Sequence, residues 1–181
     1  MVSWWTKWFA IDQNMILIIA YGNPLREDDG AGLVLAEKLD TVLRHYTVDV
    51  QRIETHQLLP ELSGEIAAVQ PDAVMFIDTR VATSPVERVY VERIRASEAS
   101  SPGLGHHLNP QAVLTYAAAL YDEAPSSWVV TVPGWQFDFG EALSARSQEA
   151  ISLAFNDQES QLSRLVAELQ ELPTTRHNDV P

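Results

Sequence analysis

The clearest structural signals of this sequence lie in residues 15–32, MILIIAYGNPLREDDGAG. The first seven residues are an apolar run that ends at a glycine, which is typical of a strand buried on both faces of a parallel sheet. A polar segment with three consecutive acidic residues, 27–29, comes next. Apolar residues then recur at helical spacing over residues 31–43, so the stretch predicts a strand, a loop and a helix in succession.

The alternation of strands and helices continues along the chain. Further strands are expected at residues 47–54, 72–78, 86–94 and 128–132. Helices are expected at residues 31–44, 59–69 and 110–121, and residues 141–172 are expected to form one long or broken helix. Asn109 as N-cap and Pro110 as first helical residue favour the third helix start. The pattern predicts an α/β, three-layer sandwich with a mostly parallel central sheet of about five strands flanked by helices.

The domain organisation follows from the same pattern. We expect a single domain over residues 15–172, preceded by an aromatic N-terminal extension at 1–14 and followed by a flexible tail at 173–181. The chain has 181 residues, of which 46% are hydrophobic and 20% are charged, and this composition supports a buried core. We expect the protein to be a monomer.

The charge balance and the absence of cysteine exclude several classes of function. With 12 Lys and Arg against 25 Asp and Glu, the net charge is −13, which repels nucleic acid and anionic membranes. Without cysteine, the chain has no disulfides, no cysteine nucleophile and no thiolate zinc site. This composition fits a cytoplasmic protein. No apolar run approaches the roughly 20 residues that span a bilayer.

Acidic and histidine side chains follow several of the predicted strands. Ligands of parallel α/β sheets bind beyond the carboxyl ends of the strands. Asp28 and Asp29 follow the first strand, Asp78 ends the third, and His106 and His107 precede the helix that begins at Pro110. Two carboxylates and one imidazole suit a borderline divalent metal, in an open site of modest affinity. His56 follows the second strand at the same edge, but no spacing argument makes it a ligand.

Simpler interpretations of these residues stand beside the metal site. Either Asp28 or Asp29 can cap the helix that follows, which leaves the second carboxylate unexplained. Asp78 can form a turn, and the histidines can be solvated loop residues. The loop lacks the G-x-G-x-x-G spacing of a dinucleotide site, and Pro24 removes an N–H donor from it. H-E-x-x-H, G-x-S-x-G and Walker signatures are absent from the sequence.

Residues 22–32, GNPLREDDGAG, resemble the opening motif of the NiFe-hydrogenase maturation endopeptidases. The similarity extends through FIDT at 76–79 and HHLNPQAVL at 106–114, and it covers most of residues 15–170. The resemblance implies a metal-dependent endopeptidase that removes a C-terminal peptide from the hydrogenase large-subunit precursor after nickel insertion. It also implies that Asp29, Asp78 and His106 are both the catalytic residues and the metal ligands. The nickel is expected to be that of the precursor, and cadmium or zinc can substitute for it.

Other readings of the same residues remain open at this stage. The adjacent His107 competes with His106 for the role of the imidazole, and either Asp29 or Asp78 can act as general base towards water. One alternative function is a non-catalytic chaperone that holds the precursor, with residues 1–14 as its docking element. Another is a related peptidase, such as a spore germination protease, with an unrelated protein substrate. The third is an α/β domain whose acidic residues only cap helices.

Overall fold

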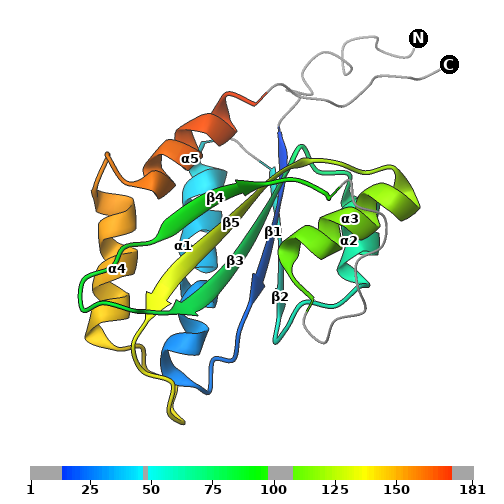
Figure 1. The fold of residues 1–181 in the computed structure, drawn as a ribbon. Coiled ribbons are helices and arrows are strands. Elements are labelled where there is room, and N and C mark those ends of the chain that lie inside the picture. The colour runs from blue at the N-terminus through cyan, green and yellow to red at the C-terminus, as the bar shows by residue number, and fades with distance from the viewer. Residues whose placement is uncertain (1–13, 47–48, 98–107, 173–181) are drawn as a thin grey trace, which may run out of the picture.

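A computed structural model describes residues 14–46, 49–97 and 108–172. Five strands form one sheet in the order β2-β1-β3-β5-β4, with helices on both of its faces (Figure 1). The strands are β1 (Met15–Tyr21), β2 (Asp49–Thr55), β3 (Ala73–Val81), β4 (Tyr90–Ile94) and β5 (Ser126–Gly134). The helices are the short η1 (Glu27–Gly30), followed by α1 (Ala31–His45), α2 (Leu62–Val69), α3 (Pro110–Tyr121), α4 (Ala145–Asn156) and α5 (Gln161–Gln170). The predicted α/β sandwich is confirmed.

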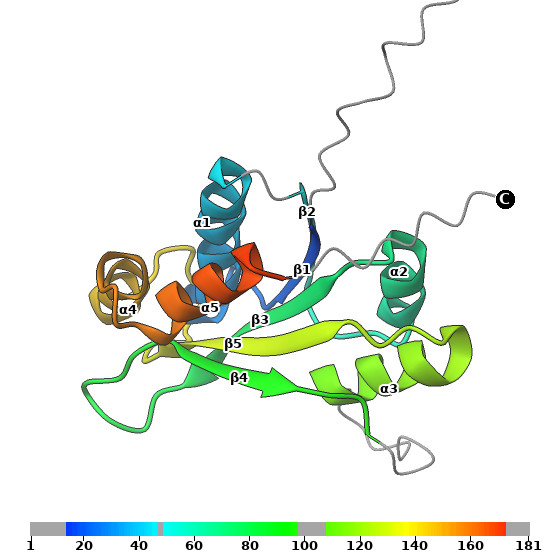
Figure 2. The same ribbon diagram turned by 90° about the horizontal axis from the view of Figure 1, so that it is seen from above.

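The apolar run of β1 serves two separate cores. Ile16 and Ile18 belong to the core beneath α1, α4 and α5, whereas Leu17 and Ile19 belong to the core beneath α2 and α3. All four side chains are fully buried. Successive side chains of a strand point to opposite faces, so a strand covered on both faces must be apolar at every position. Figure 2 shows the sheet between the two helical layers.

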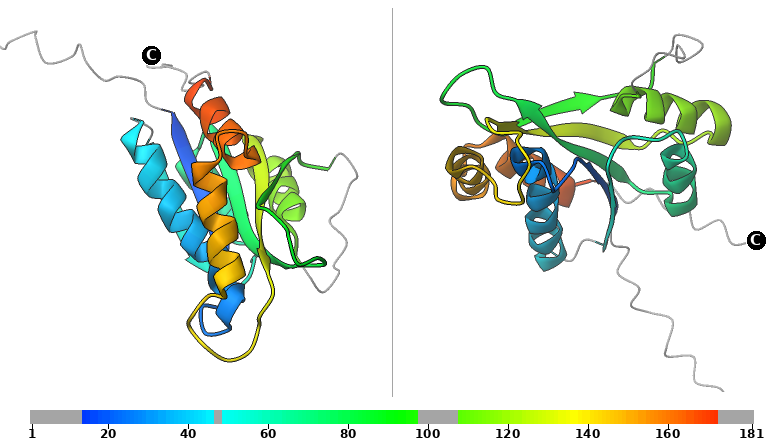
Figure 3. Two further views of the ribbon diagram at one scale, coloured as in Figure 1. Left: turned by 90° about the vertical axis from the view of Figure 1, so that its left-hand side faces the viewer. Right: turned by 90° about the horizontal axis from the view of Figure 1, so that it is seen from below.

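The helices of the first layer lie on the side seen in Figure 3, where α1 and α4 run side by side. Residues 141–172, expected to form one long or broken helix, contain two helices, because a serine caps the start of each. The Ser144 hydroxyl accepts from the Ser147 amide before α4, and the Ser160 hydroxyl accepts from the Ser163 amide before α5. Asn109 caps α3 as predicted, by accepting from the Ala112 amide.

Strand β4 is the antiparallel edge of an otherwise parallel sheet. Val89, directly before the strand, is buried and Glu92 within it is exposed, which agrees with the predicted alternation of buried and exposed side chains. The strand begins at Tyr90, not at residue 86, because Glu87 is used to build the preceding turn. The Glu87 carboxylate accepts from the Thr83 and Ser84 amides and pairs with Arg80. The hydrogen bond with Arg80 lowers the pKa of Glu87 to about 2.

Strand β3 also extends beyond its predicted end, to Val81. It pairs with β1 only as far as Ala20 and Ile77, so Asp78 still lies at the level where β1 ends. Apart from Asn14, the predicted extension and tail lie outside the described residues. Among the described residues, no helix is long and apolar enough to cross a lipid bilayer.

Candidate functional site

The carboxyl ends of β1 and β3 bring the first acidic loop against Asp78. The two strands are parallel neighbours, so the segments that follow them meet at one edge of the sheet. Gly32, in the first turn of α1, lies so close to β3 that a Cβ atom there would be 2.9 Å from the Asp78 carbonyl carbon. The Thr79 hydroxyl accepts from the Gly32 amide at 3.0 Å and lies 3.5 Å from the Asp29 carbonyl oxygen. Asp29 and Asp78 are thus held together through their backbones.

The partly buried Asp29 closes its own loop. Its Oδ2 accepts a hydrogen bond from the Asn23 amide at 2.9 Å. Gly22 allows this closure, since its φ is +147° and a Cβ atom there would lie 2.2 Å from the Asp29 carbonyl oxygen. Only glycine tolerates that approach at this φ. Neither Asp28 nor Asp29 provides a side-chain cap for η1 or α1, so the capping interpretation does not account for them.

The Asp78 side chain lies on the α2–α3 face of the sheet, on the same side as its neighbour Phe76. Its Oδ1 accepts from the Thr79 amide at 2.7 Å, and the Tyr21 hydroxyl also bonds to it. Burial and the nearby charge of Asp29 outweigh these two hydrogen bonds and raise the pKa of Asp78 to about 6. Burial and the Asp78 charge raise the pKa of Tyr21, so its hydroxyl remains a neutral donor. The site therefore contains a carboxylate that titrates close to neutral pH.

A buried hydroxyl without a partner lies beside Asp78. Thr131 of β5 is the residue in register with Asp78, and paired residues of parallel strands point to the same face. Its Oγ1 is buried and has no hydrogen-bond partner among the residues that the structure describes. Buried hydroxyls are normally hydrogen-bonded. The Thr131 hydroxyl is thus an unsatisfied polar group beside Asp78 in the described part of the chain.

Asp28, directly before Asp29, has a different environment. It is fully buried, and its carboxylate accepts four hydrogen bonds, from the Trp135 amide at 2.8 Å, the Gln136 amide at 3.0 Å, and the amide and hydroxyl of Ser144 at 2.7 Å each. Burial favours its protonated form, but these hydrogen bonds outweigh burial and lower its pKa. Asp28 thus joins the acidic loop to the connection between β5 and α4, and its four hydrogen bonds indicate a structural role.

The predicted histidines are only partly covered by the structure. His106 and His107 lie outside the described residues, so their prediction is untested. The described chain resumes at Leu108, and α3 begins on the side of the carboxyl ends because it runs back towards the start of β5 (Figure 1). His56 is exposed after β2. In residues 14–46, 49–97 and 108–172, no three His, Asp or Glu side chains are grouped closely enough to hold a metal.

Two site residues were missed by the sequence analysis, Tyr21 and Thr131. Tyr21 is the last residue of β1, and its place at a strand end next to the glycine turn was an available signal. Thr131 lies inside the predicted apolar strand, and only the register of β3 with β5 places it beside Asp78. Thr79 was noted only as part of the FIDT motif, although its hydroxyl links α1 to β3.

Comparison with solved structures identifies the fold. The NiFe-hydrogenase maturation protease HycI from Thermococcus kodakarensis KOD1 superimposes with a TM-score of 0.55 and 20% identity, over 87% of this chain and 93% of that chain. This chain has the fold of the hydrogenase maturation proteases. The hydrogenase 2 maturation peptidase from a Thaumarchaeota archaeon superimposes with a TM-score of 0.57 and 16% identity, over 86% of this chain and 97% of that chain. The hydrogenase maturating endopeptidase HybD from E. coli superimposes with a TM-score of 0.53 and 18% identity, over 87% of this chain and 93% of that chain.

Comparison of the amino-acid sequence alone gives no such match. No protein-family model and no curated protein matches it. The resemblance drawn from three short motifs is therefore confirmed through the three-dimensional structure, at the level of the fold. This likeness of fold extends over most of the length of both archaeal proteins.

Proposed function

We propose that this protein is an endopeptidase that removes a C-terminal peptide from the large-subunit precursor of a NiFe-hydrogenase after nickel has been inserted. The observation that carries the proposal is the pairing of Asp29 with Asp78 at the carboxyl edge of a fold shared with named maturation proteases. The likeness of fold supplies the reaction class, and the paired carboxylates supply a reason for metal recognition.

The nickel belongs to the substrate in this proposal, and Asp29, Asp78 and His106 are its recognition ligands. Burial is the main cause of the raised pKa of Asp78, and repulsion by the nearby Asp29 adds to it; a divalent cation would relieve that repulsion. An oxygen and nitrogen ligand set suits a borderline metal. The proposal for His106 rests on its place in the sequence, four residues before the start of α3 at Pro110.

Cleavage requires an activated water and a polarised carbonyl, and a metal ion can provide the second. In an alternative division of roles, Asp78 acts as general base towards water instead of binding the metal, because in the metal-free protein its pKa of about 6 allows it to accept a proton near neutral pH. The hydrogen bonds from Thr79 and Tyr21 fix the orientation of its carboxylate. Asp29 is the partner that positions the substrate's nickel and keeps the proton affinity of Asp78 high.

The first prediction tests these three residues directly. Asp29→Asn, Asp78→Asn and His106→Gln should each lower the rate of precursor processing at least about 100-fold, because each removes a charged or basic ligand. The measurement is the size shift of nickel-loaded precursor on a gel, followed over time. His56→Gln and Glu149→Gln are matched controls, since both residues are exposed and outside the proposed ligand set. Normal processing by all three site variants would contradict the proposal.

The same assay separates the protease from the chaperone alternative. A chaperone binds the precursor without shortening it, so the wild-type protein would form a complex and leave the precursor at its original size. Deleting residues 1–14 adds a second distinction. The protease proposal expects processing to survive this deletion, whereas a docking role for the extension expects binding to be lost.

A further inference from the structure

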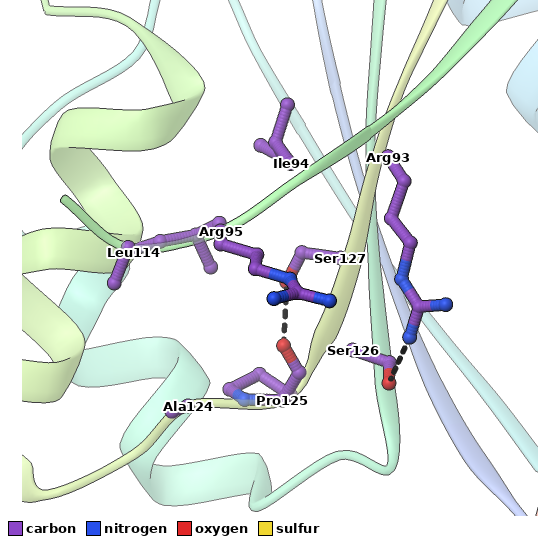
Figure 4. A pocket seen from close by; sticks show the side chains of 9 residues that line it. Arg93, Ile94, Arg95, Leu114, Ala124, Pro125, Ser126 and Ser127 are labelled. Atoms are coloured by element: carbon purple, nitrogen blue, oxygen red, sulfur yellow. Dashed lines mark hydrogen bonds between the residues drawn. The ribbon is translucent and has the colours of Figure 1, made fainter.

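A pocket lies at the opposite edge of the sheet from Asp29 and Asp78. It has a volume of about 390 Å³ and is lined by residues Arg93, Ile94, Arg95, Ala96, Leu114, Ala124, Pro125, Ser126 and Ser127 (Figure 4). These residues come from the end of β4 and the two residues after it, from the middle of α3, from the connection between α3 and β5, and from the first two residues of β5. Strand β5 continues from the pocket to Gly134, which contacts Asp28. At about 3.3 Å per residue, the pocket is therefore roughly 25 Å from the acidic loop.

The charge of this pocket is opposite to that of the protein. Two of the 12 basic residues line it, and none of the described residues that line it is acidic. Arg95 forms no ion pair with any side chain in the described part of the chain. In a protein with a net charge of −13, most arginines have carboxylate neighbours, and six others do here. The positive charge of Arg95 is thus available to a ligand.

The second arginine is held in place beside the pocket. The Arg93 guanidinium stacks over the Trp128 ring, with 5.2 Å between the guanidinium carbon and the ring centroid. It also donates to the Ser126 hydroxyl at 3.3 Å and pairs with Glu168 of α5 at 3.5 Å. Figure 4 shows the two guanidinium groups on either side of the first residues of β5. Arg93 is therefore already engaged, on the other side of β5 from Arg95, and Arg95 is the guanidinium left to bind an anion in the pocket.

The rest of the lining defines the shape of the ligand. Ile94, Leu114, Ala124 and Pro125 provide apolar walls. The Ser127 hydroxyl donates to the Pro125 carbonyl at 2.9 Å, which orders the rim, whereas the Ser126 hydroxyl accepts from Arg93 on the other side of β5. Guanidinium donors recognise carboxylate oxygens, and the volume falls within the range of small-molecule sites.

We propose that this pocket binds a small organic carboxylate with a compact apolar body, its carboxylate against Arg95 and its body against Ile94 and Leu114. The site is separate from the acidic edge, and it does not depend on the proposed protease activity. Binding is electrostatic at one end of the ligand and apolar at the other. A carboxylate without an apolar body, or a neutral molecule with the same apolar body, should therefore bind more weakly than the complete ligand.

The experiment uses benzoate as the probe on the full-length protein, by titration followed through amide chemical shifts in nuclear magnetic resonance. We expect saturable shifts at Arg95, Ser126 and Ser127, with a dissociation constant on the order of millimolar. Benzamide, which is neutral, and acetate, which has no ring, should each bind at least about tenfold more weakly. Binding of inorganic phosphate or benzamide as tightly as benzoate would contradict the carboxylate assignment.

Variants locate the binding to this pocket. Arg95→Gln should weaken benzoate binding at least about tenfold, because it removes a charge-assisted hydrogen bond to the carboxylate. Arg88→Gln is the matched control, because Arg88 precedes the same strand but pairs with Asp157, outside the pocket. Equal loss in both variants, or no saturation by benzoate in the wild-type protein, would overturn the proposal. A folded Arg95→Gln protein is verified by an unchanged spectrum away from the pocket.

Discussion

At the scale of single residues, the ionised Asp78 carboxylate lowers the stability of the folded protein at neutral pH, and the proposed function explains why it is present. Its pKa is raised from 3.8 to about 6 by burial and by Asp29. The folded protein thus holds this proton more tightly than the unfolded chain does. The resulting stabilisation is complete below pH 3.8 and is lost as the pH rises through about 6. At neutral pH the ionised carboxylate therefore destabilises the fold.

Asp78→Asn is accordingly expected to stabilise the metal-free protein at pH 7. The amide keeps a carbonyl oxygen for the Thr79 and Tyr21 donors and removes the charge, which corresponds to a gain of about 1–3 kcal/mol in the free energy of unfolding. The gain should disappear at pH 4. Urea denaturation at both pH values measures it, with the exposed Asp138→Asn as control. A less stable Asp78→Asn protein at pH 7 would show that the carboxylate is not strained.

For Asp28 the opposite effect is expected: removal of its carboxylate should destabilise the protein. Asp28→Ala leaves three amides and one hydroxyl without their buried acceptor, so it should lower the free energy of unfolding by about 3 kcal/mol or more. Because hydrogen bonds lower the Asp28 pKa, its contribution is present above pH 3.8 and is lost as the pH falls below that value. Denaturation of Asp28→Ala beside the exposed Glu141→Ala checks this. Equal stability of the two variants would be inconsistent with a structural role.

At the scale of elements, the contact between α1 and β3 depends on a glycine. A Cβ atom at Gly32 would lie 2.9 Å from the Asp78 carbonyl carbon, which is backbone and has little freedom to move. Gly32→Ala should therefore push α1 away from β3, separate Asp29 from Asp78, and lower both stability and processing. The loss of stability is expected to be about 1–3 kcal/mol.

Gly64 on α2 is the matched control for this substitution. A Cβ atom there would be 3.5 Å from the Tyr121 hydroxyl, an ordinary contact. Alanine favours a helix over glycine, so Gly64→Ala should be neutral or stabilising by up to about 1 kcal/mol. Thermal melts of the two variants, together with the processing assay, measure the difference. If both alanines have the same effect, the close approach of α1 to β3 is not what matters.

At the scale of the whole molecule, the net charge of −13 is expected to influence encounter with the precursor. A strongly acidic protein attracts a basic segment around a cleavage position, and salt screens this attraction. Processing should therefore slow as the salt concentration rises from about 50 to about 500 mM. Circular dichroism at each concentration is the control for folding. A constant rate across this series would mean that the overall charge plays no part.

The order of strands and helices was predictable from the sequence because it depends on local patterns. The apolar run of β1, the helical spacing of α1 and the Asn109–Pro110 start of α3 each predict an element without reference to the rest of the chain. The boundaries were less predictable. Ser144 and Ser160 cap the starts of two separate helices within residues 141–172, and Glu87 forms a turn, so that β4 begins at Tyr90. In each case side-chain hydrogen bonds compete with the expected element.

The candidate site was predictable to a smaller degree. The rule that parallel strands present their carboxyl ends at one edge correctly brought Asp29 and Asp78 together, since β1 and β3 are neighbours. The same rule did not distinguish Asp28 from Asp29. That distinction depends on Trp135 and Ser144, more than 100 residues further along the chain, which surround Asp28 and leave Asp29 at the edge.

The sequence by itself therefore determined the class of fold, the strand end near which each acidic group lies and the resemblance to the maturation endopeptidases, because periodicity, strand ends and short motifs are local properties of a chain. Only the tertiary structure decided which aspartate is buried, which hydroxyl beside Asp78 has no partner in the described part of the chain, and that Arg95 faces a pocket formed with β5. Burial, register and the approach of distant charges arise when separate segments pack together, and they set the pKa values and free donors on which chemistry depends.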